Sequence, residues 1–152
     1  MRWIVLLVLT LVSVKLTAQI RVYDMGYGWK PKVDSALKII KTNDVEKYNV
    51  IIKYCRTISF WSGDYSTTED SNIICISKKD IQYTSINNIA AILVHESKHL
   101  EFINTTKIYS EEIEEIVCYE YELNFLKKIE NVEPWLIEHA IKMIKYYESV
   151  IK

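Results

Sequence analysis

Two histidines and a glutamate stand in a pattern that could hold a metal ion. Residues 92–100 read ILVHESKHL and contain His95, Glu96 and His99 as His-Glu-x-x-His. In a helix, residues four apart lie on one face about one turn from each other, so both imidazoles can reach a single ion. Glu96 is rotated about 100° from His95 and can take a proton from a water molecule beside that ion. The pattern predicts a zinc site in which Glu96 is the general base.

The sequence before the motif indicates that its helix is buried. Residues 89–94 read IAAILV and are apolar on most faces of a helix. Buried histidine and glutamate side chains cost free energy unless a metal ion or hydrogen bonds satisfy them. The alternative is a coincidental or purely structural pair of histidines. We favour zinc, for which neutral imidazole is a common ligand.

From about residue 58 to residue 126, the chain resembles the zincin metallopeptidases: two strands, the motif helix, then a helix that bears glutamates. The metzincin branch extends the motif with a glycine and a third histidine, where this chain has Phe102 and Thr105. The resemblance is therefore to the gluzincin branch, in which a glutamate on the next helix is the third ligand. A small residue commonly follows that glutamate three positions later, and the sequence from Glu115 to Cys118 fits this pattern.

This resemblance implies an exported zinc-dependent peptide hydrolase. His95, His99 and Glu115 would hold the zinc, and Glu96 would activate a zinc-bound water. The substrate would be a peptide or protein, bound by strand addition along an edge strand near residues 73–77.

Helical spacing also favours Glu115 as the third ligand. Glu115 shares a stripe with Tyr119 that otherwise looks core-facing, and a buried carboxylate requires a cation. Glu111 and Glu112 remain alternatives, because residues 110–122 also read as an acidic, solvated helix face.

The chain departs from the family pattern in the residues that would orient the ligands. Relatives often place an aspartate where this chain has Tyr119, so the histidines must be oriented in another way. His139 is the only other histidine and is a candidate hydrogen-bond donor to the transition state. Tyr109, Tyr119 and Tyr121 are candidates for the same role.

The sequence around these residues predicts an α+β fold. We expect a small zincin-like domain in which a short antiparallel sheet packs on mostly helical structure. Alternating and β-rich segments predict two strands joined by an exposed loop, and apolar positions at helical spacing predict the helices. The expected strands are residues 57–61 and 72–77, and the expected helices are residues 32–41, 45–54, 86–103, 110–129 and 134–151.

The first residues predict export. Arg2 precedes an apolar run over residues 3–14, and Ala18 offers a small residue at a cleavage position. The run is shorter than the roughly 20 residues that span a bilayer. We therefore expect a signal peptide over residues 1–18, one domain over residues 19–152, a periplasmic or secreted location and no stable membrane insertion after cleavage. The alternative is an uncleaved membrane anchor.

The composition limits the other classes of function that are expected for this chain. The chain is 49% hydrophobic and 26% charged, which is typical of a folded globular protein. Its 19 basic and 20 acidic residues form no basic stripe, so nucleic acid is not an expected partner. The cysteines lack C-x-x-C spacing; Cys55 and Cys75 could pair, or all three could be small buried hydrophobic residues. The alternative function is a non-catalytic exported module, in which zinc is structural or the pocket only binds a peptide or partner. A closed zinc site would need a fourth protein ligand, for example Cys118 or a second glutamate.

Overall fold

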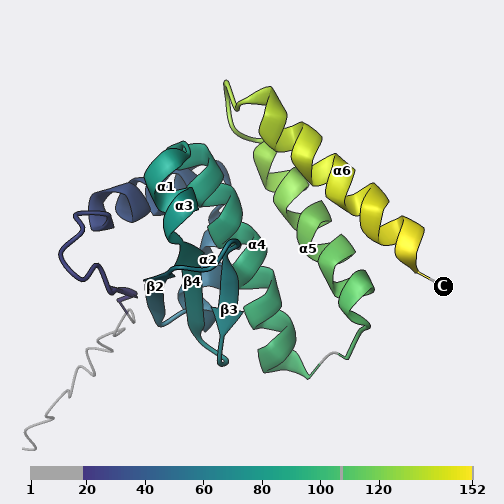
Figure 1. Ribbon diagram of the computed structural model, residues 1–152, viewed down its shortest axis with the longest axis horizontal. Helices are drawn as coiled ribbons and strands as arrows, with labels where there is room; N and C mark the ends of the chain where they lie inside the picture. The colour runs from purple at the N-terminus through teal and green to yellow at the C-terminus, as the bar shows by residue number, and fades with distance from the viewer. Residues whose placement is uncertain (1–18, 107, 152) are drawn as a thin grey trace, which may run out of the picture.

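A small mixed sheet and the helices packed against it form the α+β fold that the sequence predicts (Figure 1). The computed structural model describes residues 19–106 and 108–151, so the predicted signal peptide over residues 1–18 lies outside the described residues. Among the described helices, none has both the length and the apolar character needed to span a bilayer. The elements in chain order are β1 (Arg21–Val22), α1 (Lys30–Asn43), α2 (Val45–Tyr54), β2 (Thr57–Trp61), β3 (Thr67–Glu69), β4 (Ile73–Ser77), α3 (Lys78–Tyr83), α4 (Ile86–Thr105), α5 (Glu111–Leu126) and α6 (Pro134–Val150).

The sheet differs from the predicted antiparallel pair. Its strand order is β1-β2-β4-β3, and β2 pairs with β4 in parallel, with Ser59 opposite Cys75. The segment expected to be an exposed loop contains β3, which pairs antiparallel with the far side of β4. Because β3 reverses the chain before β4 begins, β2 and β4 run in the same direction. The expectation of an edge strand at residues 73–77 is therefore wrong: β4 is an inner strand and β3 is the edge.

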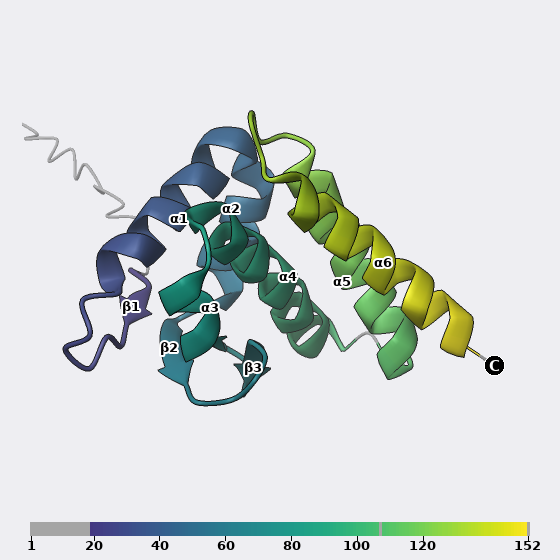
Figure 2. The same ribbon diagram turned by 45° about the horizontal axis from the view of Figure 1, so that its top comes forward.

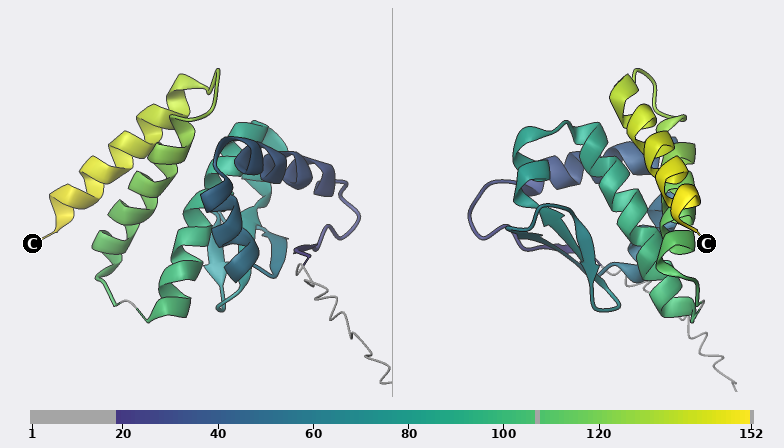
Figure 3. Two further views of the ribbon diagram at one scale, coloured as in Figure 1. Left: turned by 180° about the vertical axis from the view of Figure 1, so that it is seen from behind. Right: turned by 45° about the vertical axis from the view of Figure 1, so that its right-hand side comes forward.

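Helix α4 lies between the two halves of the molecule. Figure 3 shows α4 with α1, α2 and the sheet on one side and the α5–α6 pair on the other. Residues on most of its faces are buried, as the apolar run predicts. The Ser85 hydroxyl caps its start by accepting a hydrogen bond from the backbone N–H of Asn88 at 3.1 Å. The two histidines are thus carried by the most enclosed helix of the fold.

Two groups of buried side chains hold α4 in this position. The larger group joins α4 to α1, α2 and the sheet, and includes Ile40, Ile58 and Leu93. The smaller group joins α4 to the α5–α6 pair and consists of Ala91, Leu126, Leu136 and Ala140. Figure 2 shows α5 and α6 lying side by side, with α5 next to α4. Apolar contact therefore fixes α5 against the helix that carries the motif.

The cysteines are buried and free. Cys55, Cys75 and Cys118 form no disulfide, so the Cys55–Cys75 bridge considered from the sequence is not present. The Cys75 sulfur instead lies 3.0 Å from the Ser59 hydroxyl on the neighbouring strand. The cysteines pack as small buried side chains.

Candidate metal centre

His95 and His99 converge on one point from successive turns of α4. Their Nε2 atoms lie 3.2 Å apart, and the ring centroids are 5.1 Å apart. His95 is buried and His99 is half-buried, so neither ring is a freely solvated surface group. The rings thus meet at the nitrogen atoms through which both could bind one ion.

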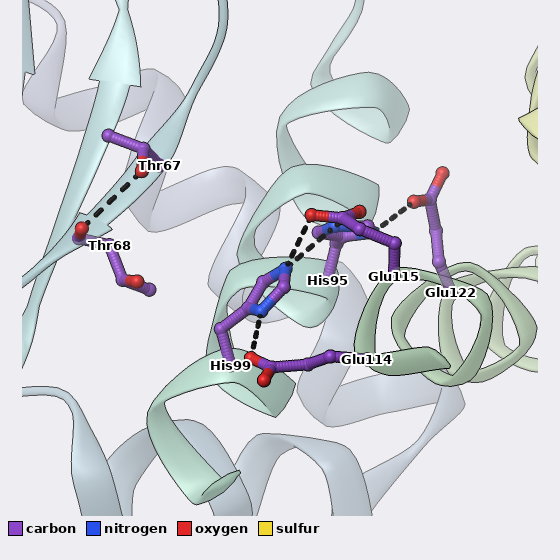
Figure 4. A network of polar contacts seen from close by, with 7 residues as sticks. All are labelled: Thr67, Thr68, His95, His99, Glu114, Glu115 and Glu122. Atoms are coloured by element: carbon purple, nitrogen blue, oxygen red, sulfur yellow. Dashed lines mark hydrogen bonds and ion pairs between the residues drawn. The ribbon is translucent and has the colours of Figure 1, made fainter. Parts of the chain in front are cut away.

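Glu115 reaches the same point from α5. Its Oε2 lies 3.4 Å from His95 Nε2 and its Oε1 lies 3.4 Å from His99 Nε2 (Figure 4). Glu111 is exposed, and within the described residues neither it nor Glu112 forms an ion pair with a histidine. Of the three glutamates considered from the sequence, Glu115 is the one that the fold brings between the two imidazoles.

Two further glutamates of α5 hold the outer nitrogens of the rings. Glu122 Oε2 lies 3.1 Å from His95 Nδ1, and Glu114 Oε1 lies 2.7 Å from His99 Nδ1. With Nδ1–H donating to a carboxylate, each Nε2 keeps its lone pair for a metal ion. The two carboxylates thus supply the orientation of the histidines that the sequence left open at the position of Tyr119.

Sequence reasoning missed Glu114 and Glu122 because they were counted with the acidic, solvated face. One signal was available: Glu122 follows Glu115 by seven residues, which is two helical turns along the same face. Glu122 is 6% exposed, which is rare for a carboxylate without a cationic partner.

The electrostatics of the cluster favour a bound cation. Burial alone would lower the pKa of His95, but hydrogen bonds to Glu115 and Glu122 outweigh it and raise the pKa to about 10. The pKa of His99 is also raised, since the carboxylates, led by Glu115, outweigh burial. Burial would raise the pKa of Glu115, but the two imidazoles lower it to about 2. A metal ion would therefore displace protons from the imidazoles and find an ionised carboxylate.

Cys118 offers a competing third donor. Its sulfur belongs to a group in which one donor atom from each of His95, His99 and Cys118 lies within 4.8 Å of the others. Glu115 places one oxygen 3.4 Å from each Nε2 and is ionised, whereas burial raises the pKa of the Cys118 thiol. A metal ligand must be deprotonated, so Glu115 is the better third ligand of the two.

Glu96 lies beside this donor set without taking part in it. It is 6% exposed, and within the described residues no hydrogen bond or ion pair engages its carboxylate. Burial is the main cause that raises its pKa, opposed by the two histidines. A carboxylate held this way is suited to accept a proton from a substrate or a water molecule.

A cleft of about 860 Å³ opens over the cluster. Glu96 and both histidines line it, as do Thr67 and Thr68 of the edge strand β3, which Figure 4 shows across from the imidazoles. The cleft is large enough for a segment of peptide.

Helix α6 supplies another wall of the cleft. Trp135, His139, Met143 and Tyr147 line it at intervals of four residues, which places them on one stripe of the helix. His139 is therefore brought to the site, and its ring lies 6.0 Å from that of Tyr119. The Met143 and Tyr147 positions were not singled out from the sequence.

The tyrosines considered as transition-state donors separate into two groups. Tyr119 lines the cleft, and its ring lies 4.4 Å from that of His95. Tyr109 packs on Phe102, and the Tyr121 ring lies 3.5 Å from the Lys47 ammonium. Tyr109 and Tyr121 do not line the cleft, so Tyr119 and His139 are the candidates that remain.

Comparison with known proteins adds nothing to this geometry: no family model, no curated protein and no solved structure matches the chain. A function assigned to the chain therefore depends on the site itself.

The ligand set predicts unequal effects of two substitutions on α5. Glu115→Gln should weaken zinc binding by a large factor because, among the described residues, it removes the one carboxylate that contacts both Nε2 atoms. Glu120→Gln is the matched control, since Glu120 is exposed on the same helix. Competition titration with a zinc chelator measures both, and equal, small effects would show that Glu115 belongs to a solvated acidic face.

The carboxylates that contact the Nδ1 atoms should have a smaller effect on zinc affinity than Glu115. Glu122→Gln should weaken zinc affinity about 10- to 100-fold, as is usual when the partner of a ligating histidine is lost. The zinc stoichiometry should stay the same, because all three donors remain. Unchanged affinity in this variant would mean that Glu122 does not orient His95.

The raised histidine pKa values predict proton release. At about pH 7.5, imidazoles with an ordinary pKa would release only about a tenth of a proton each on binding zinc. Here the release should be between about one and two protons, and the apparent zinc affinity should rise with pH, because protons compete with the metal. Calorimetry in buffers of different ionisation enthalpy measures the number of protons released per zinc ion bound. A release near zero would contradict the pKa values of this cluster.

Proposed function

We propose that the chain is a zinc-dependent peptide hydrolase. The observation that carries the proposal is the convergence of His95, His99 and Glu115 on one point at the floor of a cleft. Beside it lies the Glu96 carboxylate, which has no partner in the part of the chain that the structure describes. The donor set fits zinc, since two imidazole nitrogens and a carboxylate oxygen are its usual ligands in catalytic sites.

Zinc, when bound, supplies a Lewis acid that polarises a carbonyl oxygen and makes water more acidic. Glu96 would take a proton from the attacking water and pass it to the leaving amine. His139 and Tyr119, which also line the cleft, are the candidates to donate a hydrogen bond to the oxyanion that forms at the scissile carbonyl.

The edge strand offers a place for the substrate backbone. β3 has one partner in the sheet, β4, so the backbone groups of its other edge are free to pair with an extended peptide. Thr67 and Thr68 place this strand in the wall of the cleft. An added strand would run past Glu96 and the two histidines.

A second candidate function is a non-catalytic module with a structural zinc. It is favoured by the proximity of Cys118 to both histidines, because a fourth protein ligand would close the site. The ionised Glu115 carboxylate, which lies beside both imidazoles, and the open cleft favour the hydrolase.

The division of roles on α4 gives the test. Glu96→Gln keeps the size of the side chain but removes the basic carboxylate, so cleavage of a mixed peptide library should fall by a large factor. Zinc content should stay at one ion per chain and stability within about 1 kcal/mol, since Glu96 is not a ligand.

Glu101→Gln is the control, because Glu101 lies on the same helix and pairs with Lys98 instead of lining the cleft. It should cleave peptides like the wild type. If the wild type cleaves nothing in the library while it holds one zinc ion, the structural-zinc function replaces the hydrolase.

A further inference from the structure

The walls of the cleft are strongly acidic. Among the residues that line it are six carboxylates and no lysine or arginine of the described chain. The carboxylates are Asp64, Asp80, Glu96, Glu111, Glu115 and Glu122. A bound divalent cation would offset only two of these charges, so the cleft would keep a negative potential that attracts cations.

One of these carboxylates is buried and has no partner among the described residues. Glu96 is 6% exposed, lines the cleft and has no hydrogen bond or ion pair among the described residues. A buried carboxylate in this situation favours a proton donor or a cation as its neighbour. Within the cleft, that neighbour has to come from the ligand or the solvent.

Two carboxylates lie at the sheet side of the cleft, away from the donor set. Asp80 accepts a hydrogen bond from the Ser66 hydroxyl at 2.9 Å, and Ser66 in turn accepts one from the Ser77 backbone N–H at 3.0 Å, which fixes Asp80 in the wall. Asp64 pairs with the exposed Lys79, which does not line the cleft. These contacts use Oδ2 of Asp80 and Oδ1 of Asp64, and the other oxygen of each carboxylate has no partner among the described residues. Each aspartate therefore keeps an acceptor for a side chain that points from a bound peptide toward the sheet.

Aromatic rings complete the lining. Trp135 and Tyr147 belong to the α6 stripe, and Tyr65 is 68% exposed in the segment before β3. The face of an aromatic ring attracts an ammonium or guanidinium group. The aromatic walls thus favour the same kind of ligand as the carboxylates.

From these charges and rings we infer that the cleft selects peptides that carry lysine or arginine side chains in the segment that occupies it, with Asp64 and Asp80 as specificity determinants. The inference rests on the proposed peptide hydrolase for the presence of a peptide in the cleft. Attraction of this kind is screened by salt, so the preference for basic peptides should decrease as ionic strength rises.

The experiment compares three peptides that are identical except for lysine, glutamine or glutamate at the variable positions. Binding to the zinc-loaded Glu96→Gln chain is measured by fluorescence anisotropy, so that the peptides stay intact, and kcat/KM is measured on the chain with Glu96 present. The lysine peptide should bind most tightly and be cleaved most efficiently. Asp64→Asn and Asp80→Asn should each reduce its advantage by about two- to fivefold, as expected for a partly exposed charge pair.

Asp34→Asn is the matched control. Asp34 is, like Asp64, an exposed aspartate in an exposed ion pair with a lysine, but it lies on α1 and does not line the cleft. This variant should keep the full preference for lysine. Thermal unfolding of each variant shows whether the fold is intact.

Equal binding of the three peptides, a preference for glutamate, or a lysine preference that neither cleft variant reduces would overturn the inference. If none of the peptides is cleaved but the lysine peptide still binds best and depends on Asp64 and Asp80, the hydrolase proposal fails and the inference about the cleft stands. If peptides are cleaved without regard to charge, the hydrolase proposal stands and the inference fails.

Discussion

The balance of charge around two buried imidazoles is the constraint on which the rest of the structure depends. His95 and Glu96 lie within the most enclosed helix of the fold, where an uncompensated polar group costs free energy. Helix α5 compensates the imidazoles with three carboxylates that contact the rings: Glu114, Glu115 and Glu122. The face of α5 that packs on α4 consequently carries carboxylates from Glu114 to Glu122, with the buried Cys118 among them, and becomes apolar at its end, where Phe125 and Leu126 are buried.

This arrangement explains why the apolar contacts lie where they do. The small cluster of Ala91, Leu126, Leu136 and Ala140 fixes α5 and α6 to α4 beyond the polar contacts, so the carboxylates of α5 are held over the histidines. The sheet lies on the other side of α4, and its edge strand β3 bounds the cleft. Two separate apolar cores thus leave an opening between them, and the polar cluster lies at its floor.

The sequence predicted the parts of this arrangement that depend on local periodicity. The helices α1, α2, α4, α5 and α6 lie close to the expected ranges, because amphipathic spacing and capping residues act within one element. The His95, Glu96 and His99 set follows from one helical turn. The direction of β2 relative to β4 was mispredicted, because it depends on where β3 pairs, which no local pattern specifies. Glu114 and Glu122 were missed for a similar reason: the rotation of α5 against α4 decides which glutamates meet the rings.

The central claim is that zinc is held by His95, His99 and Glu115 and leaves a position open for substrate or water. X-ray absorption spectroscopy of the zinc-loaded chain tests it most directly, because sulfur and nitrogen or oxygen ligands differ clearly in distance. We expect two imidazoles and oxygen ligands at about 2.0 to 2.2 Å, with no sulfur. A sulfur ligand at about 2.3 Å would identify Cys118 as a ligand and contradict the open, three-ligand site.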